Sequence, residues 1–212
     1  FECKRPEMKD DVDIVITVME LAKMIRTAGI DFDNLEDAEF DVPFGLGSGA
    51  AQIFGITGGV METALRTVYE VVTGNSLEER LEFTAVRGFE GIREASLQIG
   101  DLTVKVAIVH GLANAKKVLE LVREGKADYH FIEIMSCPGG CIGGGGNAPT
   151  TWKKLAARRD AIYREDRNLP IRKSHENPYV QQIYKEFLGE PLSEKSHELL
   201  HTHYISRRDL IR

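Results

Sequence analysis

The stretch Phe131-Ile-Glu-Ile-Met-Ser-Cys-Pro-Gly-Gly-Cys-Ile-Gly-Gly-Gly-Gly146 decides how the fold of this 212-residue chain is interpreted. Its first five residues form a short apolar run that predicts a buried strand. Cys137 and Cys141 follow, and six of the eight residues from 139 to 146 are glycine. Glycine at this density serves backbone that turns sharply or approaches a ligand closely.

The residues before this strand predict an α/β fold. Two alternating segments, 94–99 and 102–109, flank Gly100-Asp101 and indicate a hairpin. The segment 112–124 has apolar residues at helical spacing and ends at a glycine. Strand, helix and strand in this order predict a right-handed parallel βαβ unit. Open α/β sheets bind ligands beyond the carboxyl ends of their strands, which is where the two cysteines lie.

The N-terminal part predicts one more strand and a helix. The β-branched run Ile14-Val15-Ile16, within residues 12–18, indicates a buried strand. Thr17 and Glu20 match a capping box, in which each side chain bonds to the other's backbone N–H. A helix is therefore expected from this point to about Ala28.

The middle and the end of the chain predict further helices. A helix over 60–72 follows the glycine-rich stretch 45–59, and Ser76-Leu-Glu-Glu79 matches a second capping box. Beyond Pro149 the remaining segments are polar and helical in pattern, namely 151–167, 177–188 and 193–201. We therefore expect two parts, an α/β lobe with a parallel sheet over 1–149 and a helical tail over 150–212.

The composition is that of a soluble globular protein, with 42% hydrophobic and 28% charged residues. No apolar run reaches the roughly 20 residues that span a bilayer, and Phe1-Glu-Cys-Lys-Arg5 lacks the pattern of a signal peptide. A net charge of −6 without a basic face argues against a nucleic-acid partner. Three cysteines do not suit a secreted disulfide framework. We expect an intracellular protein that binds neither membrane nor nucleic acid.

The pair Cys137 and Cys141 leaves several interpretations open. The two residues fit a local disulfide, two packed thiols or half of a zinc site, and the glycine run fits a linker. The preceding strand and the interleaved glycines favour iron–sulfur ligation, because a linker needs no cysteines and a zinc site needs no four-glycine run. A cubane cluster normally takes four thiolates. Cys3 is followed by Lys-Arg-Pro6, which resembles an exposed turn, so we expect the missing ligands outside this chain.

These residues resemble those of a known family. The stretch 131–146 resembles the third signature of iron-only (FeFe) hydrogenases, a Cys-(Pro/His)-Gly-Gly-Cys motif before a glycine run. Phe54-Gly-Ile-Thr-Gly-Gly-Val-Met-Glu62 resembles a second family segment, and Phe1-Glu2 resembles the end of the family's second signature. Ser174-His-Glu-Asn177 and His197-Glu-Leu-Leu-His201 resemble the tail that some members encode as a small subunit. The resemblance implies the parallel-sheet lobe of the hydrogenase active-site domain followed by a helical tail.

The resemblance also implies a cofactor and its ligands. The family's H-cluster joins a 4Fe-4S cube to a di-iron subcluster with CO, CN and dithiolate ligands. Cys137 would ligate the cube, and Cys141 would bridge the cube to the di-iron unit, so both are predicted metal ligands. Glycine in the turn would let backbone N–H groups reach the cluster sulfides. The full set of predicted site residues comprises the catalytic Cys141, Met135, Phe54 and Gly55 and the cofactor-binding Cys137, Cys141, Gly139 and Gly140.

The resemblance further implies reversible reduction of protons to H2, and hence a role in hydrogen metabolism and electron transfer. The implied partners are the N-terminal part of the hydrogenase, which carries the other two cluster cysteines, and ferredoxin or a similar electron carrier. The fused tail is similar to that of the cytoplasmic single-chain members. The alternative within the family is an iron–sulfur assembly or sensory protein without significant H2 turnover.

Two other motifs point to different classes of protein. His197-Glu-x-x-His201 matches the helix motif of zinc proteases, but a catalytic zinc takes a third protein ligand and His203 is too close to supply it. An exposed C-terminal helix is therefore the preferred interpretation. Gly45-Leu-Gly-Ser-Gly-Ala50 superficially fits the dinucleotide fingerprint. The preceding Asp41-Val-Pro43 disfavours the strand that this fingerprint requires, so no nucleotide is expected.

Overall fold

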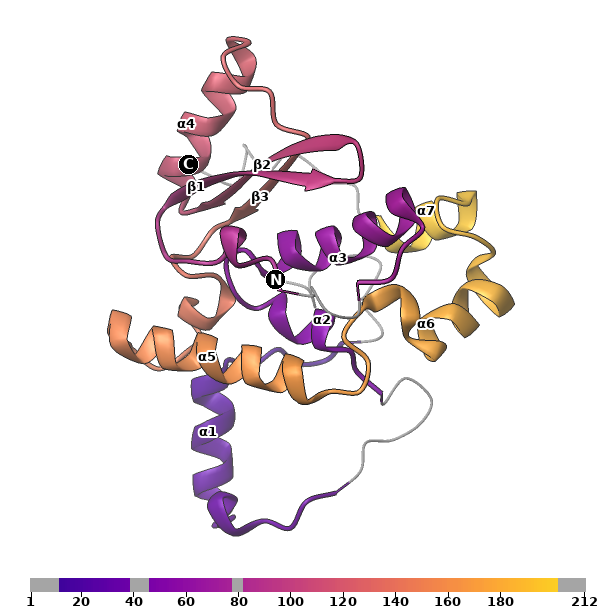
Figure 1. Cartoon of the computed structure of the whole chain (residues 1–212). Helices are drawn as coiled ribbons and strands as arrows, with labels where there is room; N and C mark the ends of the chain where they lie inside the picture. The colour runs from indigo at the N-terminus through magenta and orange to yellow at the C-terminus, as the bar shows by residue number, and fades with distance from the viewer. Residues whose placement is uncertain (1–11, 39–45, 78–81, 202–212) are drawn as a thin grey trace.

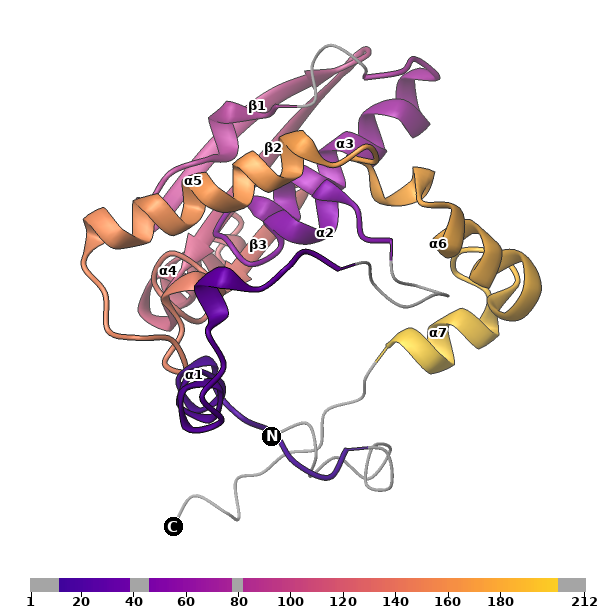
Figure 2. The ribbon, with the colours of Figure 1, turned by 90° about the horizontal axis from the view of Figure 1, so that it is seen from below.

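The computed structural model describes residues 12–38, 46–77 and 82–201 and shows an α/β fold (Figure 1 and Figure 2). Short 3₁₀ segments occur at Phe32–Asn34, Thr84–Val86, Cys141–Gly143 and Ser174–Glu176, and a π-helical segment at Tyr184–Leu188. The main elements are α1 (Val18–Thr27), α2 (Gly49–Ile53), α3 (Gly59–Thr73), β1 (Ile92–Ile99), β2 (Leu102–His110), α4 (Leu112–Arg123), β3 (Phe131–Met135), α5 (Trp152–Asn168), α6 (Pro178–Ile183) and α7 (Glu194–Leu200).

The three strands form one sheet in the order β1-β2-β3. β1 and β2 are antiparallel, with Ile99 opposite Leu102 across the predicted hairpin turn. β2 and β3 are parallel, with His110 opposite Met135 at the end that leads to the cysteines. The hairpin and the βαβ unit predicted from the sequence are therefore confirmed.

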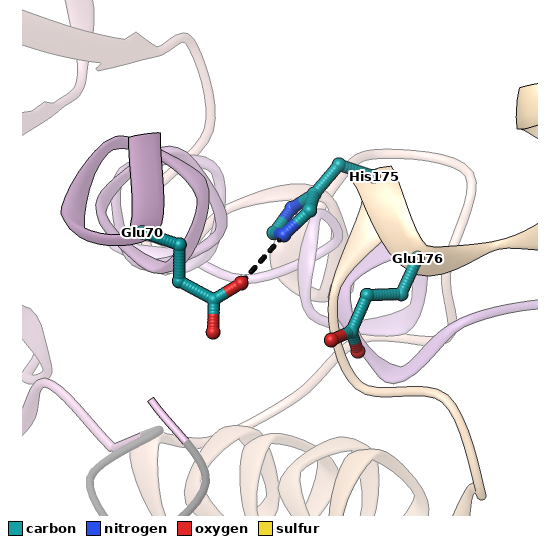
Figure 3. Close-up of side chains that lie close together, drawn as sticks. All are labelled: Glu70, His175 and Glu176. Atoms are coloured by element: carbon teal, nitrogen blue, oxygen red, sulfur yellow. Dashed lines mark hydrogen bonds and ion pairs between the residues drawn. The ribbon is translucent and has the colours of Figure 1, made fainter. Parts of the chain in front are cut away.

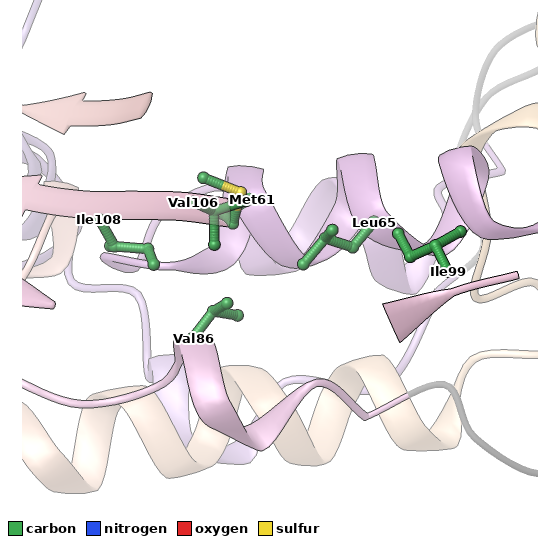
Figure 4. Packing of buried hydrophobic residues seen from close by; sticks show 6 residues of the cluster. All are labelled: Met61, Leu65, Val86, Ile99, Val106 and Ile108. Atoms are coloured by element: carbon green, nitrogen blue, oxygen red, sulfur yellow. The ribbon is translucent and has the colours of Figure 1, made fainter. Parts of the chain in front are cut away.

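Helices cover both faces of the sheet. Successive residues of β2 point to opposite sides, so β2 contacts a helix on each face. Met61 and Leu65 of α3 pack with Val106 and Ile108 on one face, as Figure 4 shows. Ala107 and Val109 pack on the other face against α4. The second half of β2, residues 106–110, is therefore buried on both faces, as its apolar run Val106–Val109 predicts.

The helical tail begins at α5, which lies on the far side of α3 from the sheet (Figure 1). Tyr163 of α5 packs with Ile53 and Ile56, and Ile142 of the cysteine turn lies against this cluster. α6 continues into the π-helical segment, and Ser193 caps α7. The predicted helical tail is confirmed. A domain boundary near Pro149 stays a prediction, because α5 contributes to the core beneath the cysteine turn.

A buried group of charges joins α3 to α5. The guanidinium of Arg66 donates to both carboxylate oxygens of Asp166 at 2.7 and 2.8 Å, and to Glu62 at 3.0 Å. All three side chains are fully buried. Burial alone would raise the pKa of Asp166, but Arg66 and Arg172 outweigh it and hold that pKa below its usual value. All of these charges are therefore partnered, as buried charges must be.

The N-terminal strand prediction is wrong. Residues 12–17 form no strand, and Ile14, Val15 and Ile16 are exposed, Ile14 by 78%. The capping box that follows is confirmed, since Glu20 N donates to Thr17 Oγ1 at 3.2 Å and Thr17 N donates to the Glu20 carboxylate at 2.7 Å. An apolar run needs a partner surface to become a buried strand, and the described residues offer none here.

The glycine-rich stretch 45–59 contains the short helix α2, which the sequence analysis missed and which Ser48 caps through Ala51 N at 3.3 Å. The second capping box lies partly outside the described residues, since Glu79 is not among them. Within the described segments, no helix combines the length and apolarity that a membrane span requires.

Removing one partner of the buried charge group should be costly. We expect Asp166→Ala to lower the free energy of unfolding by about 3–5 kcal/mol, because it leaves the guanidinium of Arg66 buried and under-paired. Urea denaturation followed by circular dichroism measures this. The matched control is Asp160→Ala, an exposed carboxylate of the same helix, which should change stability by less than about 0.5 kcal/mol. Equal effects of the two substitutions would contradict the expectation.

Candidate active site

The cysteine pair lies in a turn that leaves the end of β3. Both thiols are free, with Cys137 half-buried and Cys141 exposed. Cys141 begins a 3₁₀ segment, and its carbonyl accepts hydrogen bonds from Gly144 N at 2.9 Å and from the Asn147 side chain at 2.8 Å. The structure therefore shows no disulfide within the pair.

The turn is fastened to the Phe54–Gly59 segment by two reciprocal backbone hydrogen bonds. Thr57 N donates to Gly139 O at 3.1 Å, and Ile142 N donates to Gly55 O at 3.1 Å. Phe54, at the C-terminal end of α2, is 47% exposed. The two segments that the family resemblance assigned to one pocket are thus side by side, although about 80 residues separate them. Their predicted roles toward a cofactor stay predictions.

Gly139 and Gly140 are explained by close protein contacts. Both have left-handed backbone, with φ of +83° and +94°. A Cβ at Gly140 would lie 2.7 Å from Thr57 N, and one at Gly139 would lie 2.5 Å from the Leu155 side chain. Around Gly145, by contrast, no atom of the described residues would lie within 4 Å of an added Cβ. The first two glycines therefore let the turn dock on the protein, whereas Gly145 borders open space.

Glu133 holds the strand before the cysteines to the start of α3. Its two carboxylate oxygens accept from Gly58 N at 2.6 Å and Met61 N at 2.7 Å. Burial raises the pKa of Glu133, although these bonds and the nearby Arg93 oppose the shift. The sequence analysis missed this residue. The available signal was a carboxylate in the middle of a strand predicted to be buried, where acidic residues are rare unless they are paired. The prediction of burial is wrong for most of β3, since Phe131 and Ile134 are exposed and only Glu133 is buried.

Arg93 supports the same region from β1. Its guanidinium donates to Thr57 Oγ1 and to Val86 O, both at 3.2 Å. Burial lowers the pKa of Arg93, against the attraction of Glu90 and Glu133. Thr57 is therefore bonded through its backbone to Gly139 and through its side chain to Arg93.

The donor set fits part of an iron–sulfur cluster. Two free thiols four residues apart lie on a turn with open space next to Gly145, and thiolates are the usual ligands of such clusters. Met135 is half-buried at the end of β3, and its carbonyl accepts from Gly111 N at 2.8 Å. Phe1, Glu2 and Cys3 lie outside the described residues. The described part of the chain thus offers two of the four thiolates that a cubane normally takes.

A second group of side chains joins the C-terminal end of α3 to the tail (Figure 3). His175 Nε2 lies 2.7 Å from Glu70 Oε2, and Lys173 Nζ lies 2.7 Å from Glu70 Oε1. Glu70, His175 and Glu176 could share a metal ion by distance. However, the ammonium of Lys173 also contacts Glu176 and so already lies between the two carboxylates. We interpret this group as an ion-pair network that holds the tail to α3.

The Glu70 network makes stability depend on pH. Burial opposes ionisation, but hydrogen bonds from Lys173, Leu77 N and His175 outweigh it and lower the pKa of Glu70 to about 2. The stabilisation is therefore present above the ordinary carboxyl value of 4.5 and is lost as pH falls toward 2. We expect Glu70→Gln to cost roughly 1–2 kcal/mol at pH 7. Urea denaturation from pH 7 to pH 3 should show the two proteins converging in acid, and a difference that does not depend on pH would contradict this.

The competing motifs gain no support. His197 lies on α7 and His201 directly follows this helix, with ring centroids 4.2 Å apart. In the part of the chain that the structure describes, Glu70, His175 and Glu176 are the one set of three potential metal ligands within reach of each other. The start of the dinucleotide-like stretch lies outside the described residues. Its Gly49 packs on Asp166, where an added Cβ would lie 2.1 Å from Oδ1, so a structural contact explains this glycine.

Comparison with known proteins gives a consistent result over both parts of the chain. The family model of the iron only hydrogenase large subunit, C-terminal domain, matches residues 1–145, and that of the iron hydrogenase small subunit matches residues 153–207. The NADP-reducing hydrogenase subunit HndD of Solidesulfovibrio fructosivorans is 49% identical over 99% of this chain and 37% of its own length. Protein NAR1 of Arabidopsis thaliana is 33% identical over 92% of this chain and 42% of its own length.

A solved structure extends the likeness to three dimensions. The [FeFe]-hydrogenase HydA(deltaEFG) superposes with a TM-score of 0.73 and 40% identity, over 96% of this chain and 60% of that one. An α/β fold with two free cysteines on a glycine-rich turn after a parallel strand defines the class of site, a paired-thiol site. The chain belongs to the iron-only hydrogenase family. It spans about two fifths of the length of the curated relatives named above.

The close docking of the turn predicts a specific sensitivity to substitution. Gly140→Ala places a Cβ against Thr57 N at a backbone angle that alanine rarely adopts, which should destabilise the protein by about 2–4 kcal/mol. It should also increase the rate at which a disulfide reagent labels Cys137. Gly145→Ala, where φ is not positive and the space is open, is the control and should change stability by less than about 0.5 kcal/mol. Similar labelling and unfolding in both variants would show that the turn is not fixed at Gly140.

Proposed function

We propose that this chain contributes part of the active site of a hydrogenase that catalyses the reversible reduction of protons to H2 at an H-cluster. The observation that carries the proposal is the free thiol pair after β3, in a turn hydrogen-bonded to the Phe54–Gly59 segment. The 49% identity to the HndD hydrogenase subunit supports it. The proposed protein is an oxidoreductase with an electron carrier of the ferredoxin type.

Each residue has a proposed task at this site. Cys137 would serve as a ligand of the 4Fe-4S cube, and Cys141 as the ligand shared by the cube and the di-iron subcluster. Met135, Phe54 and Gly55 would line the pocket and exclude water, and backbone N–H groups of the turn that have no protein acceptor would donate to cluster sulfides. When bound, the H-cluster supplies the redox chemistry, and the protein supplies ligation, orientation and a dry pocket.

The remaining cluster ligands are proposed to come from the N-terminal part of the hydrogenase, outside these residues. The exposed surface of α1 supports this. None of its residues is buried, and apolar side chains such as Val18, Leu21 and Met24 are about half exposed. α1 is joined to the cysteine turn by a bond from Met19 N to Gly146 O at 3.1 Å. A partner surface over α1 would therefore also cover the glycine run.

A second candidate is an iron–sulfur assembly or sensory protein without significant H2 turnover. Its support is the 33% identity to NAR1 and about 32% identity to proteins described as probable cytosolic Fe-S cluster assembly factors. Both candidates fit a cytoplasmic protein that uses the same thiolates. They differ in whether the loaded protein evolves hydrogen.

The test uses this chain joined to the polypeptide that carries the rest of the catalytic domain, loaded with the cofactor by the family's maturation proteins. We expect Cys141→Ala to abolish hydrogen evolution and Cys137→Ala to lower cluster iron as well, because each removes a thiolate ligand. Cys3→Ala is the matched control and should leave iron content and activity unchanged.

The readouts are iron analysis, electron paramagnetic resonance and hydrogen evolution with a reduced low-potential dye. Undiminished hydrogen evolution and an unaltered spectrum in Cys141→Ala would overturn the proposal. A wild-type protein that holds the cube but evolves no hydrogen would favour the assembly or sensory function.

A further inference from the structure

Glu133 lies on β3, four residues before Cys137, and caps a helix that is remote in sequence. Helix α3 begins without a side-chain cap of its own, because its N-cap residue is Gly58. The first N–H groups of a helix have no partner within the helix. The carboxylate of Glu133 accepts two of them, from Gly58 at 2.6 Å and from Met61 at 2.7 Å, across 75 and 72 residues of chain.

The segment whose Gly58 is bonded to Glu133 is also hydrogen-bonded to the cysteine turn. Gly58 ends the segment in which Gly55 O accepts from Ile142 N and Thr57 N donates to Gly139 O. Three residues thus attach the chain around the cysteines to one segment. Glu133 lies before the two cysteines, Gly139 lies between them, and Ile142 directly follows Cys141. All three attachments converge on residues 55–61.

Packing of an apolar core does not by itself explain why residue 133 is a glutamate. Glu133 is 5% exposed in a strand whose neighbours on β2 are apolar, and a buried carboxylate costs free energy unless its oxygens are bonded. A valine would fill a strand position without that cost. What a carboxylate adds is direction, because its two oxygens fix the helix end relative to the strand, and negative charge is favourable there.

We infer that Glu133 is a positioning residue, which sets the geometry of the Cys137 and Cys141 thiolates by locking the strand that precedes them to the N-terminus of α3. The inference deepens the proposed function and rests on it for the identity of the metal cluster. Glu133 is not proposed to touch the cluster. It acts through Gly58, Thr57 and the cysteine turn.

The first test needs no cluster. Amide hydrogen exchange of the 212-residue chain is compared with that of Glu133→Gln, which keeps the shape of the side chain but loses the charge and one acceptor. We expect exchange to accelerate about tenfold at Gly58 and Met61, and also at Thr57 and Ile142. A factor of ten corresponds to about 1.4 kcal/mol of local opening free energy. Glu133→Asp, which keeps the charge but withdraws it by one methylene, provides a second comparison if the glutamine variant folds poorly.

Glu70→Gln is the matched control, because it removes a carboxylate from the other end of the same helix. It should lower global stability. The exchange rates of the Thr57 and Ile142 amides, each divided by the rate of the core amides, should stay unchanged. If the Glu133 variants accelerate exchange only at Gly58 and Met61, the residue is a helix cap and nothing more, and the inference is overturned.

The second test uses the cofactor-loaded protein described above. Glu133→Gln should retain its iron, because all thiolates remain, but shift the paramagnetic spectrum and the reduction potential of the cube relative to both wild type and Glu70→Gln. A loaded variant with wild-type spectrum and potential would overturn the inference. If the wild-type protein takes up no cluster, the proposed function fails instead, and the exchange experiment still decides whether Glu133 orders the turn.

Discussion

The bidentate ion pair between Arg66 and Asp166 is the contact on which the arrangement of the other elements depends. It is fully buried and lies between α3 and α5, so it fixes the helix that supports the sheet against the first helix of the tail. Glu62 and Arg172 complete the group. Because neither charge can remain buried alone, the two helices can adopt few other relative positions. The regions that match the large-subunit and small-subunit families are therefore held as one structure.

Helix α3 carries this constraint to the site. One face packs on the sheet through Met61 and Leu65, and its N-terminus is capped by Glu133 of β3. Its opposite end is bonded to the tail through Glu70 and Lys173. The cysteine turn is thus attached to a helix that is itself fixed at both ends. A turn rich in glycine would otherwise be among the most flexible parts of a protein, and such attachment is what a preorganised ligand pair requires.

The cysteine turn is open on one side. The thiol of Cys141 is exposed, and the space beside Gly145 is open. α1, joined to the end of the glycine run at Gly146, has an apolar surface that nothing in the described residues covers. This apolar surface lies next to the open side of the cysteine turn, where the proposed partner would complete the core and the ligand set. This is consistent with relatives that are more than twice as long.

The sequence by itself determined the local elements and the chemical character of the site. The βαβ unit, the hairpin at Gly100, the capping box at Thr17 and the helical tail follow from short-range pattern and capping chemistry, which neighbouring residues decide. The cysteine and glycine signature likewise indicated a thiolate site. Tertiary structure alone decided whether Ile14–Ile16 would be buried, why Gly139 and Gly140 are glycine, and what Glu133 and Asp166 bind. Gly140, Glu133 and Asp166 meet atoms about 70 to 100 residues away, and no local pattern records which distant surface a residue will meet.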